Sequence, residues 1–417
     1  MRTSSIRRSR ARVTASAALG MLLVGIASVP AHAKDFRGRQ WHLNTMGAEE
    51  IWQLSTGKGV TVAVIDTGVE KQNPDLRGQV LKGKDFATDK PGDEFTDYNG
   101  HGTGMAGLIA GTGERDGGNG AFGLAPGAKI LPVRVPGGDS GTKSQAAADE
   151  EFNRVVPDAI RYAVDSGAKV INISMAVGAG SPKLTESVKY ALGKGALVFA
   201  GVGNDAEKGN RPMYPAATPG VVGVGAIDKE LTRIPMSQHG DQVDIVAPGK
   251  DLVHACGGGT GMCTTTGTSD ATALASASAA LLWAKHPDWT NNQVLKVMLN
   301  TIAGPKGGEE RSDYIGFGAV RPLRTLKTPG DPGPADVRPI DDLTEAAPET
   351  ATATPTPSDL PAADPAPAES SAAPAPAPQA AATDDGGNTG LWIGLGIGAA
   401  VLIGAAVAVP VLRSRRS

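Results

Sequence analysis

Between positions 60 and 227, apolar runs alternate with stretches rich in small residues. The runs are apolar at successive positions, so strands formed from them would be buried on both faces. Strands of this kind, alternating with helices, are typical of a parallel sheet. We therefore predict an α/β fold, a parallel sheet with helices on both faces. The predicted strands are "VTVAVID" (60–66), "KILPVRV" (129–135), "AKVINISM" (168–175), "ALVFAGVG" (196–203) and "GVVGVGAI" (220–227). The predicted helices span 102–111, 157–167 with Pro157 as first residue, and 184–195.

Two terminal segments predict export and membrane anchoring. A basic stretch, an apolar run and the small residues "AHA" predict a signal peptide over residues 1–33, with an uncleaved anchor as the alternative. The uncharged run 390–412 is long enough to cross ~30 Å of hydrocarbon, and the basic tail 413–417 indicates a cytoplasmic end. Small residues recur in this run at every fourth position, a spacing that lets another membrane helix approach closely. We expect a single-pass protein of the cell membrane whose main part is extracytoplasmic.

The composition changes sharply over residues 328–389, which are mostly Pro, Ala, Thr, Asp and Glu. Such a segment buries too little apolar surface to offset the entropy of ordering. It predicts a disordered, extended linker. The folded part then covers residues 34–327, with an N-terminal extension over 34–58 and the main domain over 59–327.

Charge and cysteine content narrow the class of protein. The chain has a net charge of −3, whereas nucleic-acid-binding proteins usually carry a basic face. The charge therefore gives no indication of nucleic-acid binding. Cys256 and Cys263 are the only two cysteines, and an oxidising compartment favours a disulfide between them. A metal site there has too few ligands, since His254 is the only nearby histidine. We predict no metal and no cofactor.

Three polar residues stand where elements of the predicted fold begin or end. Asp66 ends the first strand, His101 opens the first helix, and Ser269 opens an alanine-rich stretch. Each has an ordinary alternative, respectively a turn carboxylate, a turn histidine and a helix N-cap. A weakly nucleophilic hydroxyl needs a base, and an imidazole oriented by a carboxylate supplies one. Their order Asp, His, Ser is one of the known chain orders for this chemistry.

The motifs "VIDTGV", "NGHGTGMAGLIAG" and "GTSDATA" together resemble the subtilisin-like serine proteases, over about residues 40–324. The resemblance implies a subtilisin-like peptidase domain over 59–327. It implies Ser269 as nucleophile, His101 as general base and then acid, and Asp66 as its orienting partner. Asn204 in "AGVGNDAEKG" is similar to the family's oxyanion asparagine, with a simple turn as the alternative. Many relatives bind calcium, which is therefore possible here, although no loop can be assigned to it.

Substrate binding is expected along two stretches by the same resemblance. An extended peptide would pair with the backbone of the first stretch, and the second would form a wall of the specificity pocket. Two core strands with glycine bends are a compatible alternative. The expected substrate-binding residues are Ser174, Met175, Ala176, Val177, Gly178, Ala200 and Gly201.

The stretch "QWHLNTMGAEEIWQLSTGKGVTVAVIDTGV", with the signal peptide, linker and terminal span, looks like a mycosin, a membrane-anchored protease of type VII secretion. The extension 34–58 is too short to fold alone and is expected to wrap around the catalytic domain. Two functions follow from this resemblance. One is an extracytoplasmic endopeptidase acting on proteins or peptides, and the alternative is a structural subunit that stabilises a secretion complex.

Asp270 departs from the family, in which an apolar residue is common after the serine, and Ala273 replaces a common proline. The simpler interpretation of Asp270 is a charge suited to a helix N-terminus. The other hypothesis places it at the mouth of the site, where it raises the pKa of His101 and favours a basic residue after the cut.

Overall fold

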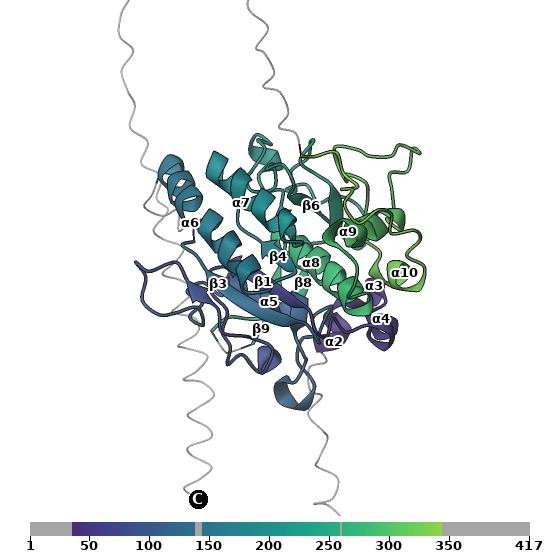
Figure 1. The fold of residues 1–417 in the computed structure, drawn as a ribbon. Coiled ribbons are helices and arrows are strands. Elements are labelled where there is room, and N and C mark those ends of the chain that lie inside the picture. Colours follow the sequence, from purple (N-terminus) through teal and green to yellow (C-terminus); the bar gives the residue numbers. More distant parts are fainter. Residues whose placement is uncertain (1–35, 138–143, 259–260, 344–417) are drawn as a thin grey trace, which may run out of the picture. The chain divides into compact units, whose positions relative to one another are not determined.

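The computed structural model describes residues 36–137, 144–258 and 261–343, and within them a seven-stranded sheet in which every pairing is parallel (Figure 1). The strand order is β2-β3-β1-β4-β5-β6-β7. This confirms the predicted parallel α/β sheet. The strands are β1 (Thr61–Asp66), β2 (Lys84–Asp85), β3 (Lys129–Arg134), β4 (Val170–Ile173), β5 (Leu197–Gly201), β6 (Val222–Ile227) and β7 (Ile245–Pro248).

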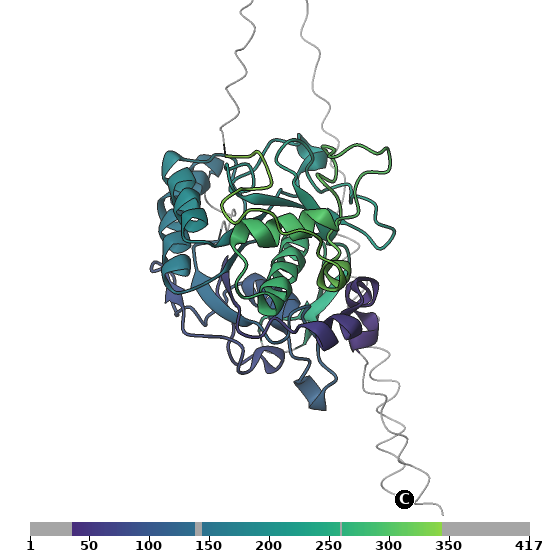
Figure 2. The same cartoon turned by 45° about the vertical axis from the view of Figure 1, so that its right-hand side comes forward.

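Helices cover both faces of this sheet, as the doubly buried strands require (Figures 1 and 2). One face packs against α6 (Gln145–Asp165) and α7 (Pro182–Gly193). The opposite face packs against α5 (His101–Ala110), α8 (Thr268–Lys285) and α9 (Asn291–Asn300). Because β1, β4 and β5 are neighbours, the carboxyl ends of these three strands meet at one edge, the place where sites form in such sheets.

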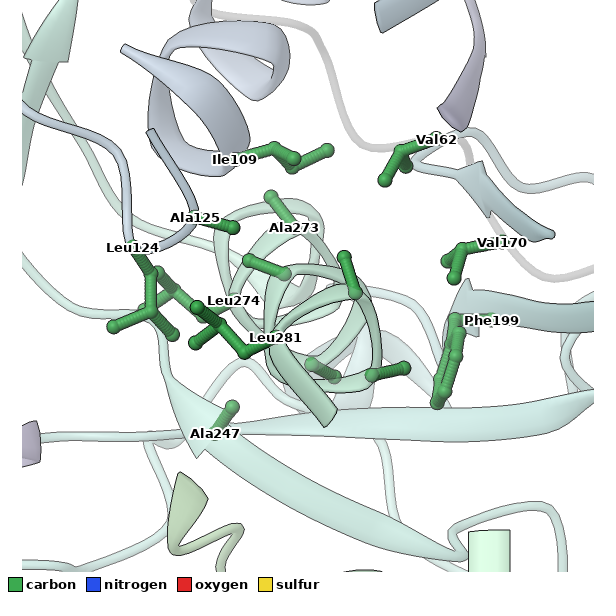
Figure 3. Packing of buried hydrophobic residues seen from close by; sticks show 14 of the residues in the cluster. Val62, Ile109, Leu124, Ala125, Val170, Phe199, Ala247, Ala273, Leu274 and Leu281 are labelled. Atoms are coloured by element: carbon green, nitrogen blue, oxygen red, sulfur yellow. The ribbon is translucent and has the colours of Figure 1, made fainter. Parts of the chain in front are cut away.

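Helix α8 lies in the middle of the larger core and is buried almost all around (Figure 3). Its alanines let it approach β4, β5, β6 and β7 closely, and Phe199 and Leu281 fill the space around it. A helix with no polar face must be enclosed by protein. The alanine-rich stretch after Ser269 is thus explained by packing.

Helix α6 differs from its prediction, because it begins at Gln145 and continues through Pro157. Pro157 was predicted as its first residue, since proline lacks the N–H that a helix interior uses. The upstream turns form regardless, because Ser144 caps them by accepting from Ala147 N at 3.3 Å. Phe152 and Val155 are buried against the sheet and hold these turns in place.

The N-terminal extension forms α2 (Phe36–Arg39), α3 (Trp41–Met46) and α4 (Ala48–Leu54), and α3 and α4 pack onto the main domain as expected. Gln40 is fully buried, and its amide donates to Phe122 O at 2.7 Å and Val253 O at 3.0 Å. Leu43 and Ile51 are also fully buried. The extension is therefore an integral part of the core.

The folded part of the chain continues beyond α10 (Pro322–Lys327), because residues 328–343 also pack onto the domain. These residues were predicted to belong to the disordered linker, since their composition is rich in Pro and Asp. They are ordered because their backbone carbonyls accept hydrogen bonds from polar side chains on and around α9, and Ile340 is buried with 7% exposure.

The predictions for the two ends of the chain concern residues that the structure does not describe. The signal peptide (1–33), the linker after residue 343, the span 390–412 and the tail 413–417 lie outside the described residues. Within 36–343, apart from the gaps at 138–143 and 259–260, no helix combines the length and apolar character that a membrane span needs.

The two cysteines form the predicted disulfide. It joins Cys256, next to β8 (Leu252–Ala255), to Cys263 in β9 (Met262–Thr265), with the Cα atoms 5.1 Å apart. The two strands form an antiparallel hairpin that leads directly into α8.

Candidate active site

Asp66 and His101 form the central contact of the site. Asp66 is the last residue of β1 and its side chain is fully buried, whereas the side chain of His101, the first residue of α5, is 34% exposed. Nδ1 of His101 lies 2.8 Å from Asp66 Oδ1 and 3.0 Å from Oδ2. A carboxylate here can only accept, so Nδ1 carries the proton and Nε2 is left as the basic nitrogen.

The start of α5 is held in position by polar caps. Asp97 accepts from Gly100 N at 2.9 Å and from Thr103 N at 2.8 Å. The backbone passes very close to the loop after β1 at Gly102, where a Cβ atom would lie 2.2 Å from Gly68 O. Only glycine fits at position 102, which lets the start of α5 approach the loop after β1.

Ser269 is the second residue of α8, and two hydrogen bonds tie it to Ser174, directly after β4. Its Oγ donates to Ser174 O at 3.1 Å, and Ser174 Oγ donates back to Ser269 O at 3.1 Å. In this conformation Ser269 makes no hydrogen bond to His101. Catalytic hydrogen bonds are often loose in proteins without substrate, and rotation about the Cα–Cβ bond would redirect Oγ.

The amide of Asn204 is oriented by the backbone of α8. Thr268 N donates to Asn204 Oδ1 at 2.9 Å. Because a backbone N–H only donates, its partner must be the amide oxygen, and Nδ2 is left to face elsewhere. Asn204 and Ser269 both line one pocket of about 200 Å³, so an amide donor lies beside the candidate nucleophile.

Four of the seven predicted substrate-binding residues line this pocket, namely Ser174, Met175, Ala176 and Gly201. Val177, Gly178 and Ala200 do not. Val177 exchanges hydrogen bonds of 2.9 and 2.8 Å with Tyr214, so its backbone is already paired. Ala200 is fully buried, and Gly178 N donates to Asp149 at 3.0 Å.

The pocket also contains residues that the sequence analysis missed. Met213 comes from a loop before Tyr214, and no periodicity or motif in that loop points to a site. Gly203, Asp205 and Thr268 could have been found, since each is adjacent in sequence to Asn204 or Ser269. A larger groove of about 670 Å³ between α3 and α10 contains none of the predicted site residues.

The electrostatics of the site favour a charged histidine. Burial lowers the pKa of His101, but the charge and hydrogen bond of Asp66 outweigh it, with further contributions from the charges of Asp270 and Asp97. The result is a pKa raised to about 9. The carboxylates around His101 therefore stabilise an imidazolium.

Asp270 is not at the mouth of the site, contrary to one of the two hypotheses. It is only 1% exposed, because α8 begins beneath the β8–β9 hairpin, and its Oδ1 lies 2.6 Å from the Thr265 hydroxyl. Burial raises the pKa of Asp270 to about 7, although Thr265 and the charge of His101 act in the opposite direction. The part of the hypothesis that links Asp270 to the pKa of His101 agrees with the electrostatics.

The next feature is the set of side chains that could bind a metal ion. Across the part of the chain that the structure describes, no three His, Cys, Asp or Glu side chains gather as a ligand set. The absence of a cofactor, with calcium left possible, stays a prediction.

A buried carboxylate bonded to a histidine, and a pocket lined by a serine at a helix start and by an amide donor, are the components that serine hydrolases use. The chain belongs to the subtilase family (peptidase S8), whose model matches residues 57–318. An intracellular serine protease of Paenibacillus polymyxa is 35% identical over 240 residues, or 56% of this chain and 70% of the relative. Other curated relatives are matched over about half to seven-tenths of their length.

Solved structures narrow the resemblance. The MycP3 protease from the type VII (ESX-3) secretion system is 31% identical, with a TM-score of 0.61, over 69% of this chain and 87% of that one. MycP1, described as an essential component of the type VII (ESX-1) secretion system, is 30% identical, with a TM-score of 0.60, over 72% and 90%. The protein is thus a subtilisin-like serine endopeptidase with mycosins as structural neighbours.

Proposed function

We propose that this chain is an extracytoplasmic endopeptidase, anchored in the cell membrane by its C-terminal span, that acts on proteins or peptides beside a type VII secretion system. Asp66, His101 and Ser269 form its catalytic triad. The observation that carries the catalytic part is the bond between buried Asp66 and His101 Nδ1, since it fixes the tautomer that a general base needs. The location rests on the sequence of the two termini.

The first step needs the neutral form of His101, which predominates above its pKa of about 9. Ser269 Oγ leaves the carbonyl of Ser174 and attacks the substrate carbonyl carbon, while His101 Nε2 takes its proton. The resulting oxyanion accepts from Asn204 Nδ2 and the backbone N–H of Ser269. The C–N bond then breaks, His101 returns the proton to the leaving amine, and an acyl-enzyme ester remains. Water, deprotonated by His101, attacks this ester, the C–O bond to Ser269 breaks, and His101 returns the proton to Ser269 Oγ as the carboxylate product leaves.

The test of catalysis uses the full chain in detergent and a fluorophosphonate probe that acylates activated serines. We expect labelling and peptide cleavage by the native chain. Ser269→Ala should show no labelling and a loss of cleavage of about 10⁴-fold or more. Ser174→Ala is the matched control, because it removes a hydroxyl bonded to Ser269 but leaves the nucleophile in place. Equal labelling of the native chain and Ser269→Ala would refute the assignment.

The alternative function, a structural subunit of a secretion complex, is favoured by the description of MycP1 as an essential component. An experiment in cells distinguishes the two functions. If Ser269→Ala stops processing of a partner and secretion continues, while loss of the whole protein stops secretion, both functions hold. If Ser269→Ala changes nothing and loss of the protein stops secretion, the structural function alone holds.

A further inference from the structure

A second buried histidine and carboxylate lie behind the candidate triad. His254 in β8 is 2% exposed and Asp270 in α8 is 1% exposed. The hydroxyl of Thr265, in β9, lies 2.7 Å from His254 Nε2 and 2.6 Å from Asp270 Oδ1. On its other side, His254 Nδ1 lies 2.7 Å from Ala255 O. These contacts form one continuous chain of hydrogen bonds.

Counting hydrogens in this chain shows that it needs one extra proton. The carbonyl of Ala255 only accepts, so His254 Nδ1 must carry a hydrogen. The two contacts of the Thr265 hydroxyl then need two hydrogens, and the hydroxyl has one. The second must reside on His254 Nε2 or on Asp270 Oδ1. In either case the sum of the charges of His254 and Asp270 is zero.

Burial decides where this proton resides. A charged pair would leave two ions without water, whereas a neutral acid and a neutral imidazole avoid that cost. Burial raises the pKa of Asp270 to about 7 and lowers the pKa of His254 to about 4. Protonated Asp270 then donates to Thr265, Thr265 donates to His254 Nε2, and His254 Nδ1 donates to Ala255 O.

This chain lies within electrostatic range of His101. Gly104 is one turn beyond His101 in α5, and a Cβ atom there would lie 2.7 Å from His254 Cε1, so the missing side chain lets the ring pack on the helix. Asp270 directly follows Ser269. The charge of His101 acts on both His254 and Asp270.

The other ionisable groups around the two histidines come from separate elements. Asp66 and Asp97 face His101. His42 and Arg37 belong to the N-terminal extension, and the charges of His254 and Arg37 act on His42. None of these groups is part of the hydrogen-bonded chain, so its proton is a property of His254, Thr265 and Asp270.

We propose that His254, Thr265 and Asp270 share one proton, and that its release places a negative charge behind His101 that stabilises the imidazolium formed in catalysis. Asp270 is accordingly a positioning residue that acts through His101. The proposal rests on the proposed role of His101 as general base. Below the pH of release the network is neutral, and above it the network carries one negative charge that raises the affinity of His101 for its proton.

The informative variant is Asp270→Asn in the full chain. Asparagine keeps the shape and a donor toward Thr265, but it cannot release a proton. We expect the acidic limb of kcat/KM against pH to move to lower pH by about one unit, and the alkaline plateau to fall by up to about tenfold. Thr265→Ser keeps the hydroxyl and should retain the native profile. A native profile in active Asp270→Asn would overturn the proposal.

A second measurement keeps the test independent of activity. In the Ser269→Ala background, nitrogen NMR of labelled histidine reports the protonation of His101 and His254. We expect Asp270→Asn to lower the pKa of His101, and His254 to be neutral with its proton on Nδ1 at pH 7. An unchanged His101 pKa, or a charged His254 at pH 7, would overturn the proposal. Failure of the proposed function would instead appear as labelling of Ser269→Ala by the fluorophosphonate probe.

Discussion

At the scale of single residues, the site depends on side chains whose orientation is determined by an unambiguous partner. The Nδ1–H of His101 points to a carboxylate that only accepts, and Asn204 Oδ1 accepts from a backbone N–H that only donates. The first bond leaves His101 Nε2 as the basic nitrogen, and the second leaves Nδ2 as the free end of the Asn204 side chain, which lines the pocket. Such bonds hold the groups in place before substrate arrives, so little reorganisation is needed during the reaction.

Replacement of Asn204 tests this orientation. Asn204→Ala removes one oxyanion donor and should lower kcat by roughly 10²–10³-fold, a range known from subtilisin, a member of the same family. KM should change little, because the donor acts mainly in the transition state. Steady-state kinetics with a peptide substrate provide the measurement. Met213→Leu, in the same pocket, is the control and should change KM more than kcat. The role of Asn204 is wrong if its variant keeps native kcat.

At the scale of elements, the segment 328–343 shows how side chains can order a sequence that looks like a linker. Thr290 Oγ1 donates to Ala335 O at 2.9 Å, and Asn300 Nδ2 donates to Asp331 O at 2.8 Å. Further along, Arg338 bonds both Asp342 oxygens at 2.6 Å and donates to Gly220 O at 3.0 Å. The segment therefore closes over α9 and the start of β6.

Two variants, one at a buried and one at an exposed position, test whether this segment is packed in solution. Ile340 is 7% exposed, so Ile340→Ala should lower the free energy of unfolding by about 2 kcal/mol. Val337 is 55% exposed, and Val337→Ala should leave it within about 0.5 kcal/mol of native. Denaturant unfolding of residues 34–349 measures both. Equal effects would mean that the segment is not packed in solution.

At the scale of the whole molecule, the N-terminal extension joins parts of the core that are distant in sequence. Gln40 ties the loop after α5 to β8, and Trp52 donates to Leu124 O at 3.0 Å. His42 in the same extension is fully buried, and neither ring nitrogen has a hydrogen-bond partner within the described chain. Burial, then the charges of His254 and Arg37, lower the pKa of His42 to about 3.

This buried histidine predicts a sensitivity to acid. Its pKa in the folded state lies below the unfolded value of 6.5, so the stability it contributes is present above pH 6.5 and is lost as the pH falls toward 3. His42→Leu and His42→Gln should both flatten the dependence of unfolding free energy on pH between 4 and 6, by about 1.4 kcal/mol per pH unit. Denaturant unfolding of residues 34–349 at several pH values measures the slope. A native slope in both variants would contradict the titration of His42.

The parallel α/β class and the disulfide follow from the sequence alone, which also singled out Asp66, His101, Asn204 and Ser269 as candidate site residues. It could do so because apolar runs report burial directly, and because each of these residues stands at a strand or helix boundary within a short motif. Tertiary structure decided the course of α6 through Pro157, the order of residues 328–343, the pocket position of Met213 and the burial of Asp270. These depend on contacts between segments far apart in the chain, such as the hydroxyl of Thr265 over Asp270 or Asn300 beneath Asp331, and local composition carries no record of such contacts.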